Sequence, residues 1–240
     1  MRFTSEVYWD KGERILNEDS ISLQEVRVKG EKVVFAVVCD GIGGLDYGEV
    51  ASGFVTERMT EWFYKEALMM LKRHKGRRKI EKAGLRVLYA CNEEMVRFGT
   101  ERGVKLGTTV TALLCKGRYY YLWHSGDGRA YRIKRKGFKG EIKQLTRDHV
   151  FKNGILVRCV GSFEWRRPDV RSGYMIGKNV FLLCSDGFRN RIGEERLKEA
   201  LHPDLLQTRG QMAMHLREIA LYVKQRGEKD NISAIAIGNY

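Results

Sequence analysis

Proline is scarce in this 240-residue chain, which contains 2 prolines beside 26 glycines. That scarcity excludes collagen-like and proline-rich extended structures. Long apolar runs are also missing: the longest, Val33 to Cys39, is far shorter than the roughly 20 residues of a membrane-spanning helix. The first residues lack the apolar segment of a secretory signal. No linker, repeat or low-complexity stretch interrupts the pattern, so we expect a single globular domain over residues 1–240, without a membrane span.

The five cysteines form no Cys-x-x-Cys pair. Their spacing therefore excludes the common zinc patterns and a disulfide framework. Most of them end apolar runs, as Cys39 and Cys184 do. We expect small buried side chains in a reducing compartment, and hence a cytoplasmic protein. Glycine-rich dinucleotide and Walker-type phosphate motifs are absent as well.

Short apolar runs rich in valine, isoleucine, tyrosine and phenylalanine predict β-strands. They are Val33–Cys39, Thr108–Cys115, Tyr119–Trp123, Ile155–Val160, Val180–Cys184 and Ile232–Ile237. Apolar residues at helical spacing predict helices over residues 51–70, 84–98 and 212–223. The segment from Tyr119 to Ile133 is typical of a hairpin, so we expect an antiparallel sheet. Because helices and strands are grouped along the chain, the pattern predicts the α+β class.

Four aspartates lie at the ends of predicted strands, each followed by Gly or Asn: Asp40, Asp127, Asp186 and Asp230. The simplest interpretation is a set of turns, because Asp-Gly is typical of hairpins. It is weaker for Asp40, since Gly41-Ile42-Gly43-Gly44 leads into a predicted helix. If such carboxylates converged at one end of a sheet they would repel one another. A hard divalent cation such as Mg²⁺ would neutralise them.

The net charge is +14, from 44 basic and 30 acidic residues. Two stretches, Lys72–Lys79 and the segment from Arg132 to Lys139, concentrate the basic side chains. Their simplest interpretation is solvated loops; the functional one is docking of acidic or phosphorylated partners. Nucleic-acid binding is the rival hypothesis, but no recognition helix, RNA-recognition motif or zinc finger supports it. We therefore expect no specific nucleic acid.

Seven segments, in order along residues 14–233, resemble the metal-dependent protein phosphatases of the PP2C (PPM) family in their compact bacterial form. They are Arg14…Asn17-Glu18-Asp19-Ser20; Asp40-Gly41-Ile42-Gly43-Gly44 with Gly48–Ser52; Gly107-Thr108-Thr109; His124–Tyr131; Leu145–His149; Ser185-Asp186-Gly187-Phe188; and Asp230-Asn231-Ile232-Ser233. The resemblance implies a four-layer αββα sandwich, with two antiparallel β-sheets flanked by helix pairs. It also implies hydrolysis of phosphoserine or phosphothreonine by metal-activated water at a binuclear Mn²⁺ or Mg²⁺ centre.

The resemblance also implies roles for individual residues. The implied metal ligands are Glu18, Asp19, Asp40, Gly41 through its carbonyl, Asp127, Asp186 and Asp230. Asp40 would bridge two ions, and with Asp186 and Asp230 it forms the catalytic carboxylate set. Whether Glu18 or Asp19 binds directly or through water stays open. Asp127, together with Asp186, would hold a third ion, and Arg14 would grip the substrate phosphate in a bidentate manner.

Two departures from the family pattern bear on mechanism. Ile42 stands where many animal members have a histidine proposed as general acid. The acid therefore stays open between a bound water, His124 and His149. The flap that borders the active site is shortened to about residues 150–159, which predicts open access for substrate. The implied partners are phosphorylated proteins, including a Ser/Thr kinase and its substrates. We expect the chain itself to be a monomer. The alternative is a catalytically weak or inactive relative that binds phosphopeptides as a regulator.

Overall fold

The computed structural model describes residues 2–43, 45, 47–137 and 140–240. Gly44 of the Asp40 motif and Lys139 of the second basic stretch therefore lie outside the described residues. Within the described part, the strands form two antiparallel five-stranded sheets. Sheet A runs in the order β1 (Phe3–Asp10), β10 (Ile232–Asn239), β9 (Asn179–Cys184), β6 (Arg129–Lys134) and β7 (Glu141–Gln144). Sheet B runs in the order β2 (Asp19–Val28), β3 (Glu31–Asp40), β4 (Val110–Lys116), β5 (Tyr119–Ser125) and β8 (Asp169–Tyr174).

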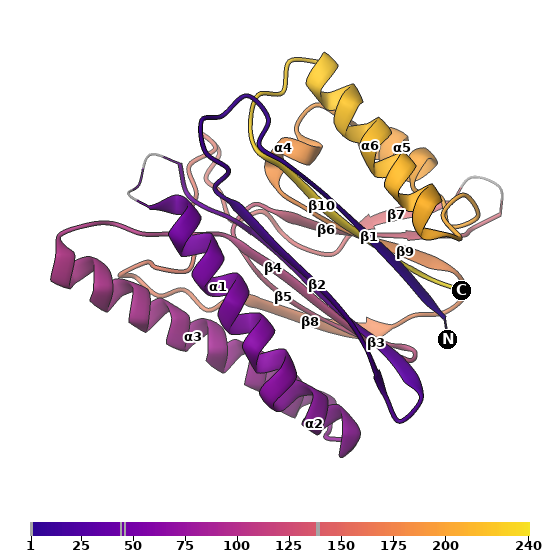
Figure 1. The fold of residues 1–240 in the computed structure, drawn as a ribbon, viewed down its shortest axis with the longest axis horizontal. Helices are drawn as coiled ribbons and strands as arrows, with labels where there is room; N and C mark the ends of the chain where they lie inside the picture. The colour runs from indigo at the N-terminus through magenta and orange to yellow at the C-terminus, as the bar shows by residue number, and fades with distance from the viewer. Residues whose placement is uncertain (1, 44, 46, 138–139) are drawn as a thin grey trace.

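Helices cover the outer face of each sheet (Figure 1). Sheet B is covered by α1 (Gly48–Trp62), a π-helical turn η1 (Phe63–Ala67), α2 (Leu68–Lys72) and α3 (Arg77–Arg102). Sheet A is covered by α4 (Asp186–Arg189), α5 (Glu194–Ala200) and α6 (Arg209–Gln225). The expected four-layer αββα sandwich is thereby confirmed.

Three buried apolar layers separate the four layers of secondary structure. In β3, Phe35 and Val37 face the helices, whereas Val34 and Ala36 face sheet A. A strand that is buried on both faces must be apolar throughout, which explains the uninterrupted run in the sequence. Val38 faces sheet A as well, and Asp40, two residues further along the strand, shares its face. Asp40 therefore points into the space between the sheets.

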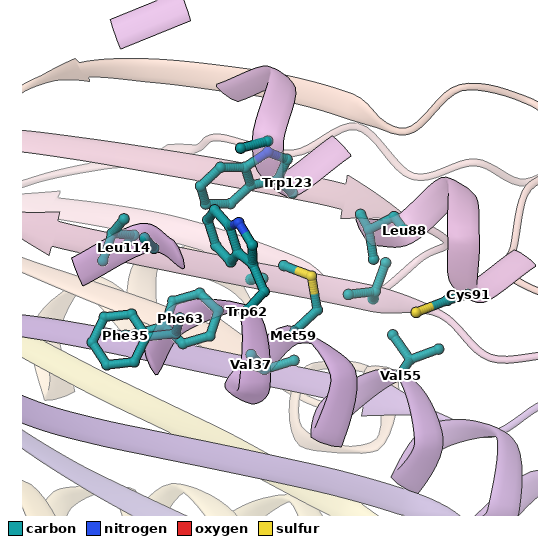
Figure 2. Close-up of a cluster of buried hydrophobic side chains, with 14 of the residues drawn as sticks. Phe35, Val37, Val55, Met59, Trp62, Phe63, Leu88, Cys91, Leu114 and Trp123 are labelled. Carbon is teal, nitrogen blue, oxygen red and sulfur yellow. The ribbon is translucent and has the colours of Figure 1, made fainter. Parts of the chain in front are cut away.

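Aromatic side chains fix the helices on sheet B (Figure 2). Phe35 of β3 stacks on Phe63, with ring centroids 4.9 Å apart, and Trp62 meets Trp123 edge to face at 5.4 Å. Each such pair contributes about 0.5–1.5 kcal/mol beyond its buried area. These contacts anchor the C-terminal end of α1 on β3 and β5, the strands that run toward the predicted site.

The predicted hairpin from Tyr119 to Ile133 is wrong. β5 pairs with β4 and β8 in sheet B, whereas β6 pairs with β7 and β9 in sheet A. The chain crosses between the sheets at residues 126–128. Gly126 has a φ of +119°, and a Cβ there would lie 2.5 Å from Thr109 Cβ, so only glycine fits this crossing. Asp127 therefore lies at the end of the sandwich rather than at the tip of a hairpin.

The predicted strand Ile155–Val160 is also wrong. Only isolated bridges join this part of the chain to its surroundings, between Val150 and Leu156 and between Val160 and Thr108. Ile155 is 59% exposed, and Arg158 interrupts the run. Residues 155–160 therefore form an irregular segment, which the bridge from Val160 to Thr108 places beside the end of the sandwich.

Of the five cysteines, four are buried and Cys159 is half-buried, and all five thiols are free. Burial raises the pKa of Cys39, Cys91 and Cys184 to about 12. Cys91 and Arg97 have the spacing of a cysteine phosphatase motif but lie within one helix, α3. The cysteines are thus unsuited to act as nucleophiles. In the described part of the chain, none of the helices has the length and apolar character required to cross a bilayer.

Candidate metal and phosphate site

Two carboxylates of the site come from sheet B. Asp19 begins β2 and Asp40 ends β3, and the two residues are direct partners in the antiparallel register. In such a pair the Cβ atoms lie about 4.5–5.5 Å apart, and like charges destabilise the ladder. Both side chains belong to the face that looks toward sheet A. The fold therefore brings two acidic groups together where the middle layer opens to solvent.

Three carboxylates from the other half of the molecule face them. Asp186 is the first residue of α4, directly after β9 and Ser185, and Asp230 lies two residues before β10. Asp127 lies on the crossing between the sheets. The neighbouring strands β9 and β10 are antiparallel, so the last residue of β9 and the first residue of β10 lie at the same end of sheet A. The structure thus brings the four aspartates identified in the sequence to one end of the sandwich, with Asp19.

Burial raises the pKa values of Asp40, Asp127 and Asp186, and repulsion between the carboxylates adds to the shifts of Asp40 and Asp186. Burial raises the pKa of Asp40 well above its ordinary range, and the charges of Asp19, Asp186 and Asp127 raise it further. Burial, followed by the charges of Asp127 and Asp230, raises the pKa of Asp186 to about 6. The pKa of Asp127 is raised mainly by burial, an effect that nearby Arg189 opposes. Deprotonating these groups together requires positive charge within the cluster.

Among these carboxylates, Asp19 gives the strongest indication that the site holds a cation. It is 2% exposed, and its pKa is raised to about 7, chiefly by burial. The hydroxyls of Ser185 and Ser233 face it from sheet A and lower its pKa, yet within the described residues neither carboxylate oxygen completes a hydrogen bond. An unsatisfied buried carboxylate is costly to the fold and is usually paired or bound to a cation. These orphaned oxygens and the all-oxygen donor set fit a hard divalent ion.

Glu18 is held by backbone contacts beside Asp19. Its carbonyl accepts hydrogen bonds from the Gly41 N–H at 3.0 Å and from Ser52 Oγ at 2.6 Å. Its carboxylate lies against the start of α1, where a Cβ on Gly48 would be 2.4 Å from Oε1. Burial, followed by the charge of Glu49, raises the pKa of Glu18. The segment thus brings the Glu18 side chain and the Gly41 backbone next to each other.

Asn231 ties the Arg14–Asp19 loop to sheet A. Its Oδ1 accepts from the Glu18 N–H at 2.8 Å, and its Nδ2 donates to the carbonyls of Lys11 and Leu16 at 2.8 and 3.0 Å. The side chain is 5% exposed. It therefore fixes the relative position of Glu18 and Asp230, which come from opposite ends of the sequence.

Arg14 lies at the rim of the cluster. Its Nη2 donates to Asp230 Oδ2 at 2.8 Å, and its side chain is 51% exposed. The hydrogen bond and charge of Asp230, with smaller effects from Glu18 and Asp186, raise the pKa of Arg14. Arg14 is thus a permanent cation that faces both solvent and the carboxylates.

The two histidines considered as general acids are committed to structural contacts. His124 Nε2 donates to the Arg147 carbonyl at 3.0 Å, because a carbonyl can only accept, and burial lowers its pKa to about 4. His149 Nδ1 accepts from the Gly126 N–H at 3.1 Å, which leaves Nε2 to donate to Asp169 at 3.2 Å. Burial also lowers the pKa of His149. Both rings are neutral near pH 7, and the hydrogen bonds between His149 and Gly126 support the crossing that carries Asp127.

The carboxylates approach one another without closing into a compact set. Among the described residues, no three acidic, histidine or cysteine side chains stand close enough together to form a ready-made metal cluster. The ligand set inferred from the sequence also includes the Gly41 carbonyl and side chains from two different sheets.

Comparison with known proteins places this geometry in a family. The model of a family described as Protein phosphatase 2C matches residues 12–227. The chain belongs to the protein phosphatase 2C family. Serine/threonine protein phosphatase PstP of Mycobacterium tuberculosis is 26% identical over 236 residues, which cover 88% of this chain and 42% of that protein. The chain thus spans less than half the length of this mycobacterial relative.

Two further relatives agree with the family assignment. Serine/threonine phosphatase Stp of Listeria welshimeri is 22% identical and is covered over 82% of its length, with 84% of this chain aligned. A solved structure of the PstP catalytic domain in complex with 2 manganese ions has a TM-score of 0.74 and 25% identity. The alignment covers 98% of this chain and 97% of that one. Members of the protein phosphatase 2C family thus share this fold over nearly its full extent.

Several residues that shape the site were not singled out from the sequence for their roles. Ser185 and Ser233 face Asp19, Ser52 holds the Glu18 carbonyl, and Arg189 donates to the Asp127 carbonyl at 3.2 Å. Ser52, Ser185 and Ser233 are fully buried. Polar residues within apolar surroundings are the available signal, because a buried hydroxyl must have a partner.

Proposed function

We propose that this protein is a metal-dependent phosphoprotein phosphatase that hydrolyses phosphoserine and phosphothreonine. The observation that supports it most is the convergence of Asp19, Asp40, Asp127, Asp186 and Asp230 from both sheets, beside an exposed arginine. Four of these carboxylates, Asp19, Asp40, Asp127 and Asp186, have pKa values raised mainly by burial, which is costly in a binding module that holds no cation. They suit a site that holds Mn²⁺ or Mg²⁺.

We infer the following ligands. Asp40, Asp186 and Asp230 would hold one ion. Asp40 would also serve a second ion, together with the Glu18–Asp19 pair and the Gly41 carbonyl, and Asp127 with Asp186 would hold a third. Divalent ions held there would supply a water of lowered pKa and neutralise phosphoryl oxygens. The manganese in the PstP structure supports the choice of ion.

The chain's own residues supply binding and orientation. The guanidinium of Arg14 binds the substrate phosphate. In the structure the same guanidinium is paired with the carboxylate of Asp230, which the phosphate would replace as its anionic partner. Asn231 and Ser52 keep the Glu18 segment in place, and the contacts of His149 to Gly126 keep Asp127 at the sandwich end. Since both histidine protons are already donated within the protein, we assign protonation of the leaving oxygen to a water at the site.

The physiological setting is part of the same proposal. Substrates are phosphorylated proteins, and the opposing enzyme is a Ser/Thr protein kinase whose products this phosphatase reverses. Five free cysteines favour a reducing compartment such as the cytoplasm. We also propose that the chain acts as a single domain and a monomer, with a short flap over residues 150–159.

Hydrolysis of p-nitrophenyl phosphate and of a phosphothreonine peptide tests this function. Purified protein is assayed with Mn²⁺, with Mg²⁺ and with EDTA, beside Asp186→Ala and the control Asp204→Ala, whose carboxylate forms surface ion pairs. We expect turnover that EDTA and Asp186→Ala abolish and Asp204→Ala preserves. Folded protein with metal but without turnover on either substrate would contradict the proposal. Retained phosphopeptide binding in that case would favour the regulator instead.

A further inference from the structure

A basic groove lies at the end of the sandwich opposite the carboxylates. It runs between the α2–α3 loop and the β4–β5 turn and has a volume of about 860 Å³. Its charged lining is Lys75 from the loop, Arg77 at the start of α3, Lys116 at the end of β4 and Arg118 from the turn, with Glu31. The first basic stretch of the sequence, Lys72–Lys79, is exposed along its whole length and supplies one wall.

The groove continues into a second hollow. A pocket of about 390 Å³ shares Glu31 and Gly117 with the groove and adds the basic side chains of Arg27 and Lys32. We use the term basic groove for the surface formed by Arg27, Lys32, Lys75, Arg77, Lys116 and Arg118. Its extent exceeds what a single phosphate or carboxylate would need, so the complementary ligand is an extended polyanion.

Of the six cations of the basic groove, only Lys32 forms a close ion pair with a residue that the structure describes, at 2.9 Å from Glu25. Arg77 and Lys116 form long ion pairs of 3.7 Å with Glu81 and Glu31. Lys75 and Arg118 form no ion pair with any residue that the structure describes. The Arg77 side chain is half exposed, and a surface pair at such a distance is worth less than about 1 kcal/mol, so an incoming carboxylate can replace Glu81 at little cost. Lys116 is more enclosed, because its side chain is 12% exposed and its Nζ also donates to the Leu71 carbonyl at 3.1 Å.

Strands connect the basic groove directly to the carboxylate site. β3 begins at Glu31 in the groove and ends at Asp40 in the site; β5 begins at Tyr119 and ends at Ser125, next to the crossing that carries Asp127. With about 3.3 Å per residue, β3 alone spans roughly 30 Å. Figure 1 shows α2 and the β2–β3 turn at the end away from α4. A ligand that reaches both sites must bridge this distance.

The aromatic residues of the groove favour a protein ligand over a nucleic acid. Tyr119 and Tyr174 are exposed, but their rings pack on each other with centroids 4.8 Å apart. Tyr121 is 6% exposed and stacks on Trp123. Because the Tyr119 and Tyr174 rings are already in contact, no space between them is open to a base. The groove thus offers charge without a slot for stacked bases.

We propose that the basic groove docks an acidic segment, rich in Asp and Glu, of the phosphoprotein substrate, about 30 Å from the phosphorylated residue. This inference rests on the proposed phosphatase function, and it assigns to the first basic stretch a role in substrate selection. An extended chain needs roughly nine residues to span the distance, whereas a folded substrate would present an acidic face at that spacing.

Peptides of graded length test the docking. Each carries a phosphothreonine, a neutral Gly/Ser linker and a run of glutamates; one linker has about 14 residues and one about four, too few to span the strands. With wild-type protein, we expect the long-linker peptide to have a KM roughly five- to tenfold below that of a peptide with a neutral tail. The short-linker peptide should show no such gain.

Charge reversal identifies the surface. Arg77→Glu combined with Arg118→Glu should abolish the gain for the long-linker peptide and leave p-nitrophenyl phosphate hydrolysis unchanged. The matched control combines Lys143→Glu on β7 with Arg217→Glu on α6, two exposed residues over the other sheet. The proposal is overturned if the acidic tail gives no gain in wild type, or if both double variants lose it equally.

Direct binding separates this proposal from the phosphatase itself. Fluorescence anisotropy with an unphosphorylated acidic peptide should show salt-sensitive binding that the Arg77/Arg118 double variant loses, whether or not the protein turns over substrate. A labelled single-stranded oligonucleotide serves as the rival probe. If it binds the groove and the acidic peptide does not, the assignment to protein carboxylates is wrong.

Discussion

The two ends of the sandwich carry opposite charge in opposite surroundings. At one end, Asp19 is almost fully buried and without a hydrogen-bond donor among the described residues. At the other, Arg118 is exposed and its charge is solvated. Burial makes the first arrangement costly and leaves the second nearly free of cost. The acidic end therefore depends on a counter-ion, whereas the basic end is stable without a partner.

The largest expected effect is on catalytic activity, which should depend on the acidic end and be almost independent of the basic end. Asp40→Asn removes the proposed bridging carboxylate, and we expect at least about a thousandfold loss in kcat/KM for p-nitrophenyl phosphate. Arg118→Glu at the basic end should change the same constant by less than about twofold. Steady-state kinetics with Mn²⁺ measure both. Comparable losses in the two variants would remove the distinction between a catalytic and a docking end.

The second expected effect is on stability and pH. In metal-free protein, the folded-state pKa values of Asp19 and Asp186, about 7 and about 6, lie above the unfolded value near 3.8. The folded state therefore holds protons more tightly, so the stabilising contribution is complete below pH 4 and is lost as the pH rises through 6 and 7. Thermal unfolding in EDTA should give a Tm that falls by several degrees from pH 5 to pH 8.

Added Mn²⁺ should reverse that trend. Ligands bind a metal in their deprotonated form, so the rise in Tm caused by Mn²⁺ should grow over the same pH interval. Asp186→Asn in EDTA should flatten the pH dependence because one raised pKa is gone. A Tm that is independent of pH in EDTA would mean that these carboxylates are not buried together.

A smaller effect is expected from the link between loop and sheet. Asn231→Ala removes three hydrogen bonds from a buried amide and should lower the free energy of unfolding by about 1–3 kcal/mol. Activity should fall as well, because Glu18 loses its support. Urea unfolding and kinetics measure the two effects. The control Asn153→Ala, at an exposed residue, should stay within about 0.5 kcal/mol of wild type.

The smallest effect belongs to the basic end. Arg118→Gln removes one of several like charges and should change the free energy of unfolding by less than about 0.5 kcal/mol in either direction. Urea unfolding at low and at high salt measures it. A loss above about 1 kcal/mol would show that Arg118 supports the β4–β5 turn, and the contrast between the two ends would need revision.

Strongly apolar strands and the order of motifs were the predictable parts of this molecule. The runs at Val33–Cys39 and Val180–Cys184 are buried on both faces, so their sequence is unambiguous. The four edge strands, β1, β2, β7 and β8, were not predicted, because each mixes charged and apolar residues. Local pattern carries little information where one face of a strand stays in contact with solvent.

The errors arose where tertiary structure overrides local sequence. The stretch from Tyr119 to Ile133 has the pattern of a hairpin, yet its two strands join different sheets. In the site, the aspartates were recognisable from their neighbours, because motif order is a one-dimensional signal. The role of Asn231 was not, because it depends on contacts more than 200 positions away in the chain.

The pairing of the first and last strands determines where a segment fused to either strand would leave the domain. β1 pairs with β10 from Phe3 opposite Asn239, and Arg2 and Tyr240 exchange two backbone hydrogen bonds. Arg2 also lines the pocket that continues the basic groove. Any segment joined to position 2 or position 240 would therefore emerge at this end, where a flexible tether creates a local concentration in the millimolar range. An acidic tag fused there would compete with substrate for the groove and leave the distant carboxylates unobstructed.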